Sequence, residues 1–132
     1  MKIVFDSNVI IAAFASRGLC NELFELCIAD HEIFISDYII EECRQKLHQK
    51  IKLPIPIIDN IIEYLRSETE IVLYHSINKD ICRDEKDLPV IGTAIASGSG
   101  IIVSGDKHLL EIKLHNKIQI LSPRELWDYL RT

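Results

Sequence analysis

Short apolar runs alternate with stretches of helical periodicity along this chain, and that alternation is the feature that most constrains its fold. The runs are continuous, as in strands buried on both faces, and they lie at residues 2–5, 32–35, 70–74, 101–103 and 117–121. Strands that alternate with helices favour a parallel sheet covered by helices on both sides. We therefore expect an α/β fold with about five parallel strands.

The segments between these runs carry helix signals. Ser36 is placed as an N-cap for a helix that runs to about residue 49. Ser122 and Glu125 form a capping-box pattern, with Pro123 at the first helical position of a last helix. Apolar spacing predicts further helices at 9–14, 21–29, 57–67, 87–97 and up to residue 112.

Composition narrows the class of protein. The chain has 132 residues, of which 48% are hydrophobic, and this is enough apolar material for one globular domain spanning 1–132. No apolar run approaches the roughly 18 residues needed to span a bilayer, and the sequence has no signal-peptide pattern, so we expect a cytoplasmic protein without a membrane segment. The four cysteines form no CxxC pair, and buried free thiols are expected.

Four acidic residues stand at unusual places in this pattern. Asp6 closes the first strand, Asp106 follows the strand at 101–103, and Asp87 opens the helix that leads into that strand. Glu42 lies in the helix after the second strand. Right-handed crossovers bring the carboxyl ends of parallel strands to one edge, where open α/β sheets bind ligands. Each acid alone has an ordinary alternative, as a turn residue, an N-cap or a solvated helix residue.

Helical phase helps to choose among neighbouring acids. At about 100° per residue, Glu42 lies at the border of the apolar face of its helix, whereas Glu41 points away from it. Asp87 lies on the inward-facing side of the helix expected at 87–97. Asp84, just before that helix, is the alternative candidate for the third acid of the site. Crowded carboxylates repel one another unless a cation neutralises them, and oxygen ligands suit Mg²⁺ or Mn²⁺.

Four segments of the chain together resemble the PIN-domain family. The family has an N-terminal Asp, a central Glu and two later Asp positions, and the match in order and spacing covers nearly the whole chain. The matching segments are Ile3–Asn8, Ile35–Cys43, Arg83–Ile91 and Ile102–Leu110. The resemblance implies a three-layer α/β/α fold and metal-dependent ribonuclease activity. Many small members are toxins of type II toxin–antitoxin systems, the VapC-like ribonucleases.

The resemblance also implies roles for single residues. Asp6, Glu42, Asp87 and Asp106 would form the acidic quartet that binds Mg²⁺ or Mn²⁺ and carries catalysis, and Ser104 matches the family's frequent Thr or Ser before the last acid. In that mechanism the metal activates a water for attack on an RNA phosphodiester, and Glu42 or Asp87 takes its proton. We expect Ser7, Asn8, Ser104 and Asp84 to support the carboxylates by hydrogen bonds or as a substitute ligand.

RNA binding has the weakest support, because the net charge of −5 does not favour a polyanion. The cations that flank the expected site, as phosphate contacts or as solvated surface charges, are Arg17, Arg83, Lys86, Lys107 and His108. Two other functions stay open: a catalytically idle PIN-like binding module, and a receiver-type phosphoacceptor domain, although no Asp closely follows the strand at 70–74 as a receiver requires.

Partners are suggested by apolar helical surface. The predicted helices carry more apolar side chains than are needed to cover one face of a small sheet. These side chains lie between Ile10 and Phe24 and between Ile57 and Leu65. We expect a second copy of the chain or an antitoxin segment to cover part of this surface. The alternative is an ordinary core.

Overall fold

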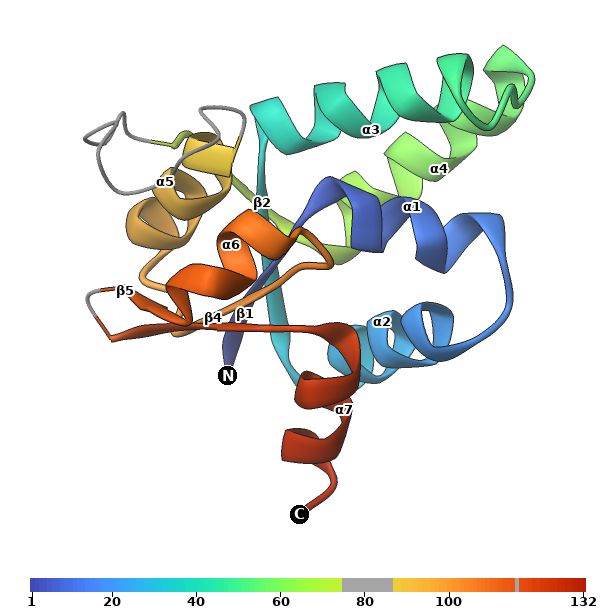
Figure 1. The fold of residues 1–132 in the computed structure, drawn as a ribbon. Helices are drawn as coiled ribbons and strands as arrows, with labels where there is room; N and C mark the ends of the chain where they lie inside the picture. The colour runs from blue at the N-terminus through green and yellow to red at the C-terminus, as the bar shows by residue number, and fades with distance from the viewer. Residues whose placement is uncertain (75–86, 116) are drawn as a thin grey trace.

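The computed structural model describes residues 1–74, 87–115 and 117–132, and its centre is a six-stranded sheet (Figure 1). The strands are β1 (Lys2–Phe5), β2 (Glu32–Ser36), β3 (Glu70–Val72), β4 (Ile101–Val103), β5 (Leu114–His115) and β6 (Ile118–Leu121). Their order is β3-β2-β1-β4-β6-β5, and all neighbours are parallel except β5 and β6. The predicted sheet of five parallel strands is therefore confirmed.

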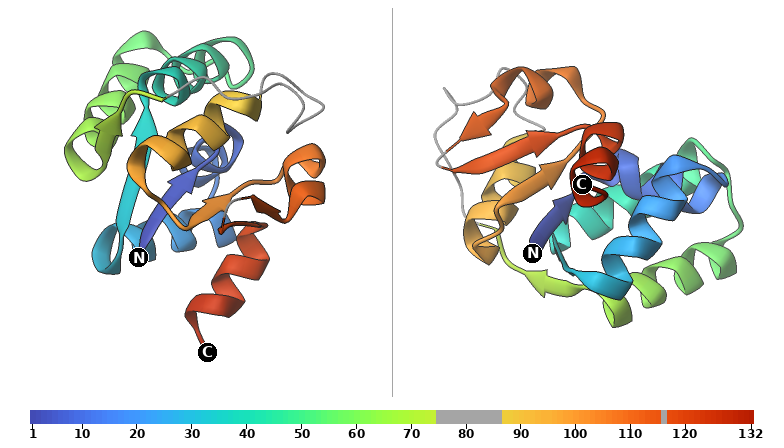
Figure 2. Two further views of the ribbon diagram at one scale, coloured as in Figure 1. Left: turned by 90° about the vertical axis from the view of Figure 1, so that its left-hand side faces the viewer. Right: turned by 90° about the horizontal axis from the view of Figure 1, so that it is seen from below.

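Helices cover both faces of this sheet, as the views from two further directions in Figure 2 show. They are α1 (Ser7–Ala15), α2 (Leu19–Asp30), α3 (Asp37–Gln49), α4 (Ile55–Glu68), α5 (Leu88–Ser97), α6 (Lys107–Ile112) and α7 (Pro123–Leu130). Helices α5 and α6 lie on one face, and α1, α2 and α4 lie on the other (Figures 1 and 2). Helix α3 continues from β2 and contacts both α1 and α5, so it bridges the two layers at the carboxyl edge.

Local sequence explains where these elements begin and end. The Ser36 side chain accepts a hydrogen bond from the Ile39 N–H and caps α3, and Ser122 with Glu125 forms the predicted capping box of α7. Gly98 ends α5 with a positive φ of 68°, a conformation that costs a glycine little. The residues of β1 and β4 are at most 4% exposed apart from Lys2, as expected for central parallel strands.

The antiparallel strand β5 was not predicted from the sequence. It is formed by two residues that pair with the start of β6. Lys113, directly before β5, and Lys117, directly before β6, both have positive φ. Two residues are too few for a periodic pattern to be visible. The strand extends the edge of the sheet beyond β6 and leaves the parallel part unchanged.

We expected more apolar helical surface than the chain itself could bury, and the structure corrects this expectation. Ile10, Leu23, Phe24, Ile58 and Leu65 are each at most 1% exposed within the single chain. The reason is that α1 packs on α2, and α4 on α3, so these helices bury side chains against one another as well as against the sheet. An ordinary core therefore accounts for most of this surface, and the homodimer stays a prediction.

Two further expectations concern cysteines and membranes. Cys27 and Cys43 are buried free thiols and Cys20 is half-buried and free, whereas Cys82 lies outside the described residues. Burial raises the pKa of the Cys27 thiol to about 12, which keeps it protonated and inert. Across the described residues, every helix is too short or too polar to cross a bilayer.

Candidate active site

The candidate site lies at the carboxyl edge of the two central strands. The chain builds the sheet outward from β1 through β2 to β3, then crosses back and adds β4 on the other side of β1. This reversal makes the carboxyl ends of β1 and β4 the switch point of the sheet, where a crevice forms. Asp6 directly follows β1, and Ser104 directly follows β4.

A polar pocket of about 410 Å³ opens at this switch point. All four acids singled out by the sequence contribute to its lining. The lining residues are Asp6, Asn8, Tyr38, Glu42, Gln45, Lys46, Gln49, Lys50, Asp87 and Asp106. Two of the carboxylates are buried, with Asp6 only 4% and Asp87 only 6% exposed. Buried carboxylates are costly, so their presence in a pocket points to a function.

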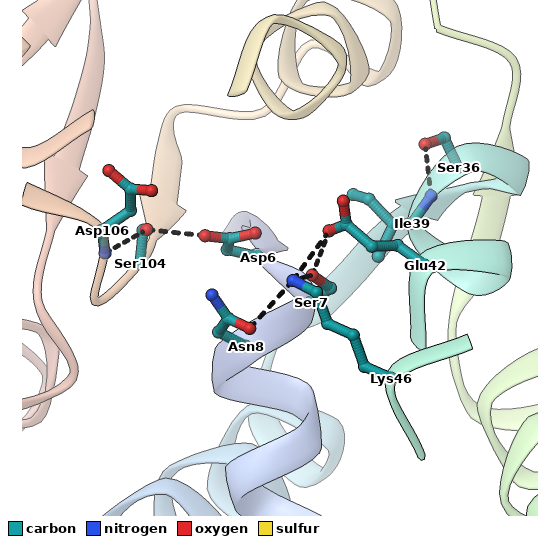
Figure 3. A network of polar contacts seen from close by, with 9 residues as sticks. All are labelled: Asp6, Ser7, Asn8, Ser36, Ile39, Glu42, Lys46, Ser104 and Asp106. Carbon is teal, nitrogen blue, oxygen red and sulfur yellow. Dashed lines mark hydrogen bonds and ion pairs between the residues drawn. The ribbon is translucent and has the colours of Figure 1, made fainter. Parts of the chain in front are cut away.

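A chain of hydrogen bonds joins the ends of β1 and β4 (Figure 3). The Ser104 hydroxyl donates to Asp6 Oδ2 at 2.7 Å, and Ser104 Oγ accepts the Asp106 N–H at 2.9 Å. The Asp106 carboxylate in turn accepts the His108 N–H at 2.7 Å and caps α6. Asp6 makes no such cap to α1, so its carboxylate is used at the pocket and not in starting the helix.

The α3 side of the pocket carries a second network, also drawn in Figure 3. The Ser7 hydroxyl donates to Glu42 Oε1, and Lys46 Nζ lies 3.6 Å from the same carboxylate oxygen. Lys46 also donates to Ser7 Oγ at 3.3 Å and to Asn8 Oδ1 at 3.0 Å. As helical phase predicted, Glu42 faces the pocket, whereas Glu41 is exposed. Lys46 therefore ties α3 to the start of α1.

On the opposite side, three side chains converge closely enough to hold one ion. Asp87, Asp106 and His108 each offer a ligand atom, and these atoms all lie within 4.8 Å of one another. Two carboxylate oxygens and an imidazole nitrogen suit a divalent cation. Asp6 and Glu42 line the same pocket but lie outside this tightest group of the described residues. The donor set thus fits the divalent metal that the sequence suggested.

The electrostatics of Asp6 follow from its position between these two sides. Burial raises the pKa of the Asp6 carboxyl above its ordinary value, and the charge of Glu42 raises it further. The hydrogen bond from Ser104 and the positive charge of Lys46 act in the opposite direction and lower the pKa. The net effect is a raised pKa, which means that the ionised form of Asp6 is under-stabilised by the chain alone.

The other predicted residues fall in several places. Ser7 and Ser104 donate to carboxylates, and Asn8 contacts the site through Lys46. Lys107 is exposed at the start of α6, directly after Asp106. Arg83, Asp84 and Lys86 lie outside the described residues.

Arg17 does not flank the acids as expected. It lines a separate hollow with Phe14, Asn21 and Tyr64. The nine residues of α1 rise about 1.5 Å each and carry the chain away from Asp6, which explains the difference.

Sequence reasoning missed Lys46 and Lys50 as pocket residues, and it treated His108 only as a flanking cation. For Lys46 a signal was present, because it stands one helical turn after Glu42 on the same face. Its contacts to Ser7 and Asn8, however, arise only when α1 packs against α3.

Comparisons with known proteins agree with this geometry. In structure, the chain matches a chain of VapBC2 from Rickettsia felis, crystallised bound to a DNA fragment from their promoter. The TM-score is 0.66 with 16% sequence identity, covering 92% of this chain and 98% of that one, and this likeness concerns the fold. The uncharacterized protein MJ1680 of Methanocaldococcus jannaschii is 29% identical over 122 residues, covering 89% of this chain and 78% of that protein. A sequence profile of the PIN domain matches residues 2–108. This chain belongs to the PIN domain family.

Proposed function

We propose that this protein is a divalent-metal-dependent endoribonuclease and the toxin of a toxin–antitoxin pair. The observation that carries this proposal is the gathering of four carboxylates around one pocket at the switch point of the sheet, two of them buried. Such burial is unfavourable without a compensating cation, and PIN domain membership gives the arrangement a nuclease context.

The four carboxylates would bind Mg²⁺ or Mn²⁺ in two ways. Asp6, Asp87 and Asp106 would ligate the ion, and Glu42 would contact it directly or through a water molecule. When bound, the ion supplies a water of lowered pKa and a positive charge that offsets the charge developing on the phosphodiester. Glu42 or Asp87 accepts the proton of the attacking water.

Neighbouring side chains keep these carboxylates in position. Ser104 holds Asp6 and the Asp106 backbone together, so that the carboxyl ends of β1 and β4 move as one unit. Ser7 holds Glu42, and Asn8 holds Lys46 against it. We assign Asp84 a supporting or substitute role beside Asp87.

The α3 side of the pocket supports binding of a polyanion. Lys46 and Lys50 line it together with Gln45 and Gln49, which gives the acidic site a rim of cationic and amide groups. These side chains can contact phosphates next to the scissile bond, as Lys107 can from the start of α6. RNA is therefore the proposed substrate despite the net charge of −5.

The proposed partners follow from the structural neighbour. VapBC2 is a toxin–antitoxin complex bound to promoter DNA, and a chain of that assembly shares this fold. We propose a cognate antitoxin protein as the partner of this chain, and a homodimer as its assembly. We also propose that the protein acts in the cytoplasm.

The deciding experiment is RNA cleavage by the purified protein. We expect cleavage with Mg²⁺ or Mn²⁺, loss of cleavage with a chelator, and recovery when the metal is restored. The Asp6→Asn variant, purified in the same way, controls for contaminating ribonucleases. RNA binding without cleavage under all metals would reject the proposal and indicate an idle binding module.

A further inference from the structure

An imidazole stands inside the acidic cluster, and neither the proposed ligand set nor the proposed catalysis uses it. His108 is the second residue of α6, two residues after the N-cap Asp106. Its ring is about one-third exposed, and Nδ1 lies 3.7 Å from Asp106 Oδ1. A ligand atom of its ring lies within 4.8 Å of the chosen oxygens of both Asp87 and Asp106.

The contacts of Asp106 argue against a simple hydrogen-bonded pair with this ring. Asp106 Oδ1 already accepts the backbone N–H of His108 at 2.7 Å, so the helix cap needs no ring contact. The distance of 3.7 Å between ring and carboxylate exceeds the range of an N–H···O hydrogen bond. The ring is thus held beside the carboxylate without being bonded to it.

Ligands of a single ion are spaced in this range. Around an octahedral ion with bonds of about 2.1 Å, neighbouring ligand atoms lie about 3.0 Å apart and opposite ones about 4.2 Å apart. The separation of 3.7 Å between Nδ1 and Oδ1 falls between these values. The spacing of the two side chains would therefore allow both of them to hold the same ion.

Given the metal-dependent reaction proposed above, we propose that His108 supplies a nitrogen ligand to the metal site and makes it select a transition-metal ion such as Mn²⁺ over Mg²⁺. Mg²⁺ is bound in proteins almost wholly by oxygen and keeps several of its waters. Imidazole is a ligand of transition-metal sites, whereas Mg²⁺ sites are built from oxygen, so one nitrogen donor should favour Mn²⁺ over Mg²⁺. The quartet of acids alone would not discriminate in this way.

The test uses the full chain and no RNA. Mn²⁺ and Mg²⁺ are titrated separately into the metal-free protein by calorimetry, and the Mn²⁺-loaded protein is studied by electron spin-echo envelope modulation. We expect tighter binding of Mn²⁺ than of Mg²⁺, together with coupling of the electron spin to a directly bound imidazole nitrogen. This spectroscopic result on the unmodified chain needs no variant.

Substitution then assigns the nitrogen to one residue. His108→Gln offers an amide oxygen in place of the ring, and the cap of α6 survives because the backbone N–H makes it. We expect loss of the nitrogen coupling and a fall of about tenfold or more in Mn²⁺ affinity, with Mg²⁺ affinity unchanged. His31→Gln, which changes a histidine at the opposite edge of the sheet beside β2, should keep the wild-type signal.

Three outcomes would overturn the assignment: no Mn²⁺ binding, Mn²⁺ bound without nitrogen coupling, or coupling that persists in His108→Gln. These results are separable from the fate of the nuclease proposal. A protein that binds Mn²⁺ through His108 and cleaves no RNA would reject only the nuclease, and cleavage without nitrogen coupling would reject only the histidine ligand.

Discussion

The two sides of the pocket balance their carboxylates by different means. On the α3 side, Glu42 lies 3.6 Å from the ammonium group of Lys46 and accepts the Ser7 hydroxyl. On the α6 side, Asp106 accepts a backbone N–H and its own N–H donates to Ser104. A lysine cancels a carboxylate charge, whereas neutral donors leave that charge in place. The difference teaches that the chain itself balances the charge of Glu42, and that the α6 side is where the proposed cation would act.

Asp6 belongs to both sides. Its carboxylate accepts the Ser104 hydroxyl, and the charges of Glu42 and Lys46 both act on it. It also follows β1, one of the two central strands of the sheet, so we expect it to be the acid that a neighbouring residue replaces least easily. Removing its charge should therefore disturb the pocket more than any change on one side alone.

The largest effect is expected for Asp6→Asn, which keeps the size of the side chain and removes its charge. We expect metal-dependent RNA cleavage to fall by a factor of about 10² or more, since a lost electrostatic contact to the transition state costs several kcal/mol. The measurement is single-turnover cleavage of an RNA oligonucleotide. Asp37→Asn, at an exposed acid in the first turn of α3, is the matched control. Wild-type cleavage by Asp6→Asn would remove the carboxylate mechanism altogether.

The next effect separates two adjacent acids on α3. Glu42→Gln should lower cleavage by a factor of about 10², the low end for a general base, because Asp87 can partly replace it. Glu41→Gln should leave cleavage unchanged, because Glu41 is exposed and Glu42 lines the pocket. Both variants are compared at matched melting temperatures. Loss of cleavage in Glu41→Gln with full activity in Glu42→Gln would show that the α3 side has been assigned to the wrong residue.

The sequence predicted the site best where an acid stands close after a strand, because the strand then fixes the position of the acid. The apolar runs of β1 and β4 located the centre of the sheet, and their order along the chain placed Asp6 and Asp106 at one edge. Helical phase was enough to distinguish Glu42 from Glu41, because α3 buries a single face, which Ile39, Ile40, Cys43 and Leu47 form.

The remainder depended on contacts between elements distant in the chain. Lys46 reads as a solvated helix residue until α1 places Ser7 and Asn8 beside it. Arg17 seemed close to Asp6 in sequence, but the intervening helix separates them. Strand β5 forms only by pairing with β6, and its two residues are too few to show a strand pattern in the sequence. The local pattern placed Lys46 one helical turn after Glu42, but it did not encode the contacts of Lys46 with α1, the position of Arg17 or the pairing of β5.

A smaller effect is expected for Lys46→Met, which tests whether the α3 side is balanced by the chain. We expect the free energy of unfolding of the metal-free protein to fall by about 1–2 kcal/mol, because Glu42 loses a charged partner. The double variant Lys46→Met with Glu42→Gln should recover part of this loss, since no unbalanced charge remains. Urea unfolding in the presence of a chelator measures Lys46→Met, Glu42→Gln and the double variant. Additive losses would show that the two residues do not interact.

The smallest effect concerns the pH dependence of stability, again without metal. Because burial raises the pKa of Asp6, the folded state keeps a proton that the unfolded state has already lost. Wild-type stability should therefore fall as pH rises from the ordinary pKa of an aspartate through the raised value. Asp6→Asn has no proton to lose there, so its stability relative to wild type should increase as pH rises above the ordinary pKa of an aspartate.

Ser104→Ala sharpens this measurement, because the Ser104 hydroxyl is the main group that lowers the Asp6 pKa. Without that hydrogen bond, the pKa of Asp6 should rise further, and the loss of stability with pH should extend to higher pH than in wild type. The buried hydroxyl is removed from Asp6 and from the Asp106 N–H together, so a constant loss at every pH is also expected. The informative quantity is therefore the slope of unfolding free energy against pH, compared with wild type and Asp6→Asn. If the unfolding free energies of all three proteins changed with pH in parallel, Lys46 would already balance the ionised Asp6. Asp106 would then be the only one of these two aspartates whose charge the chain leaves unbalanced.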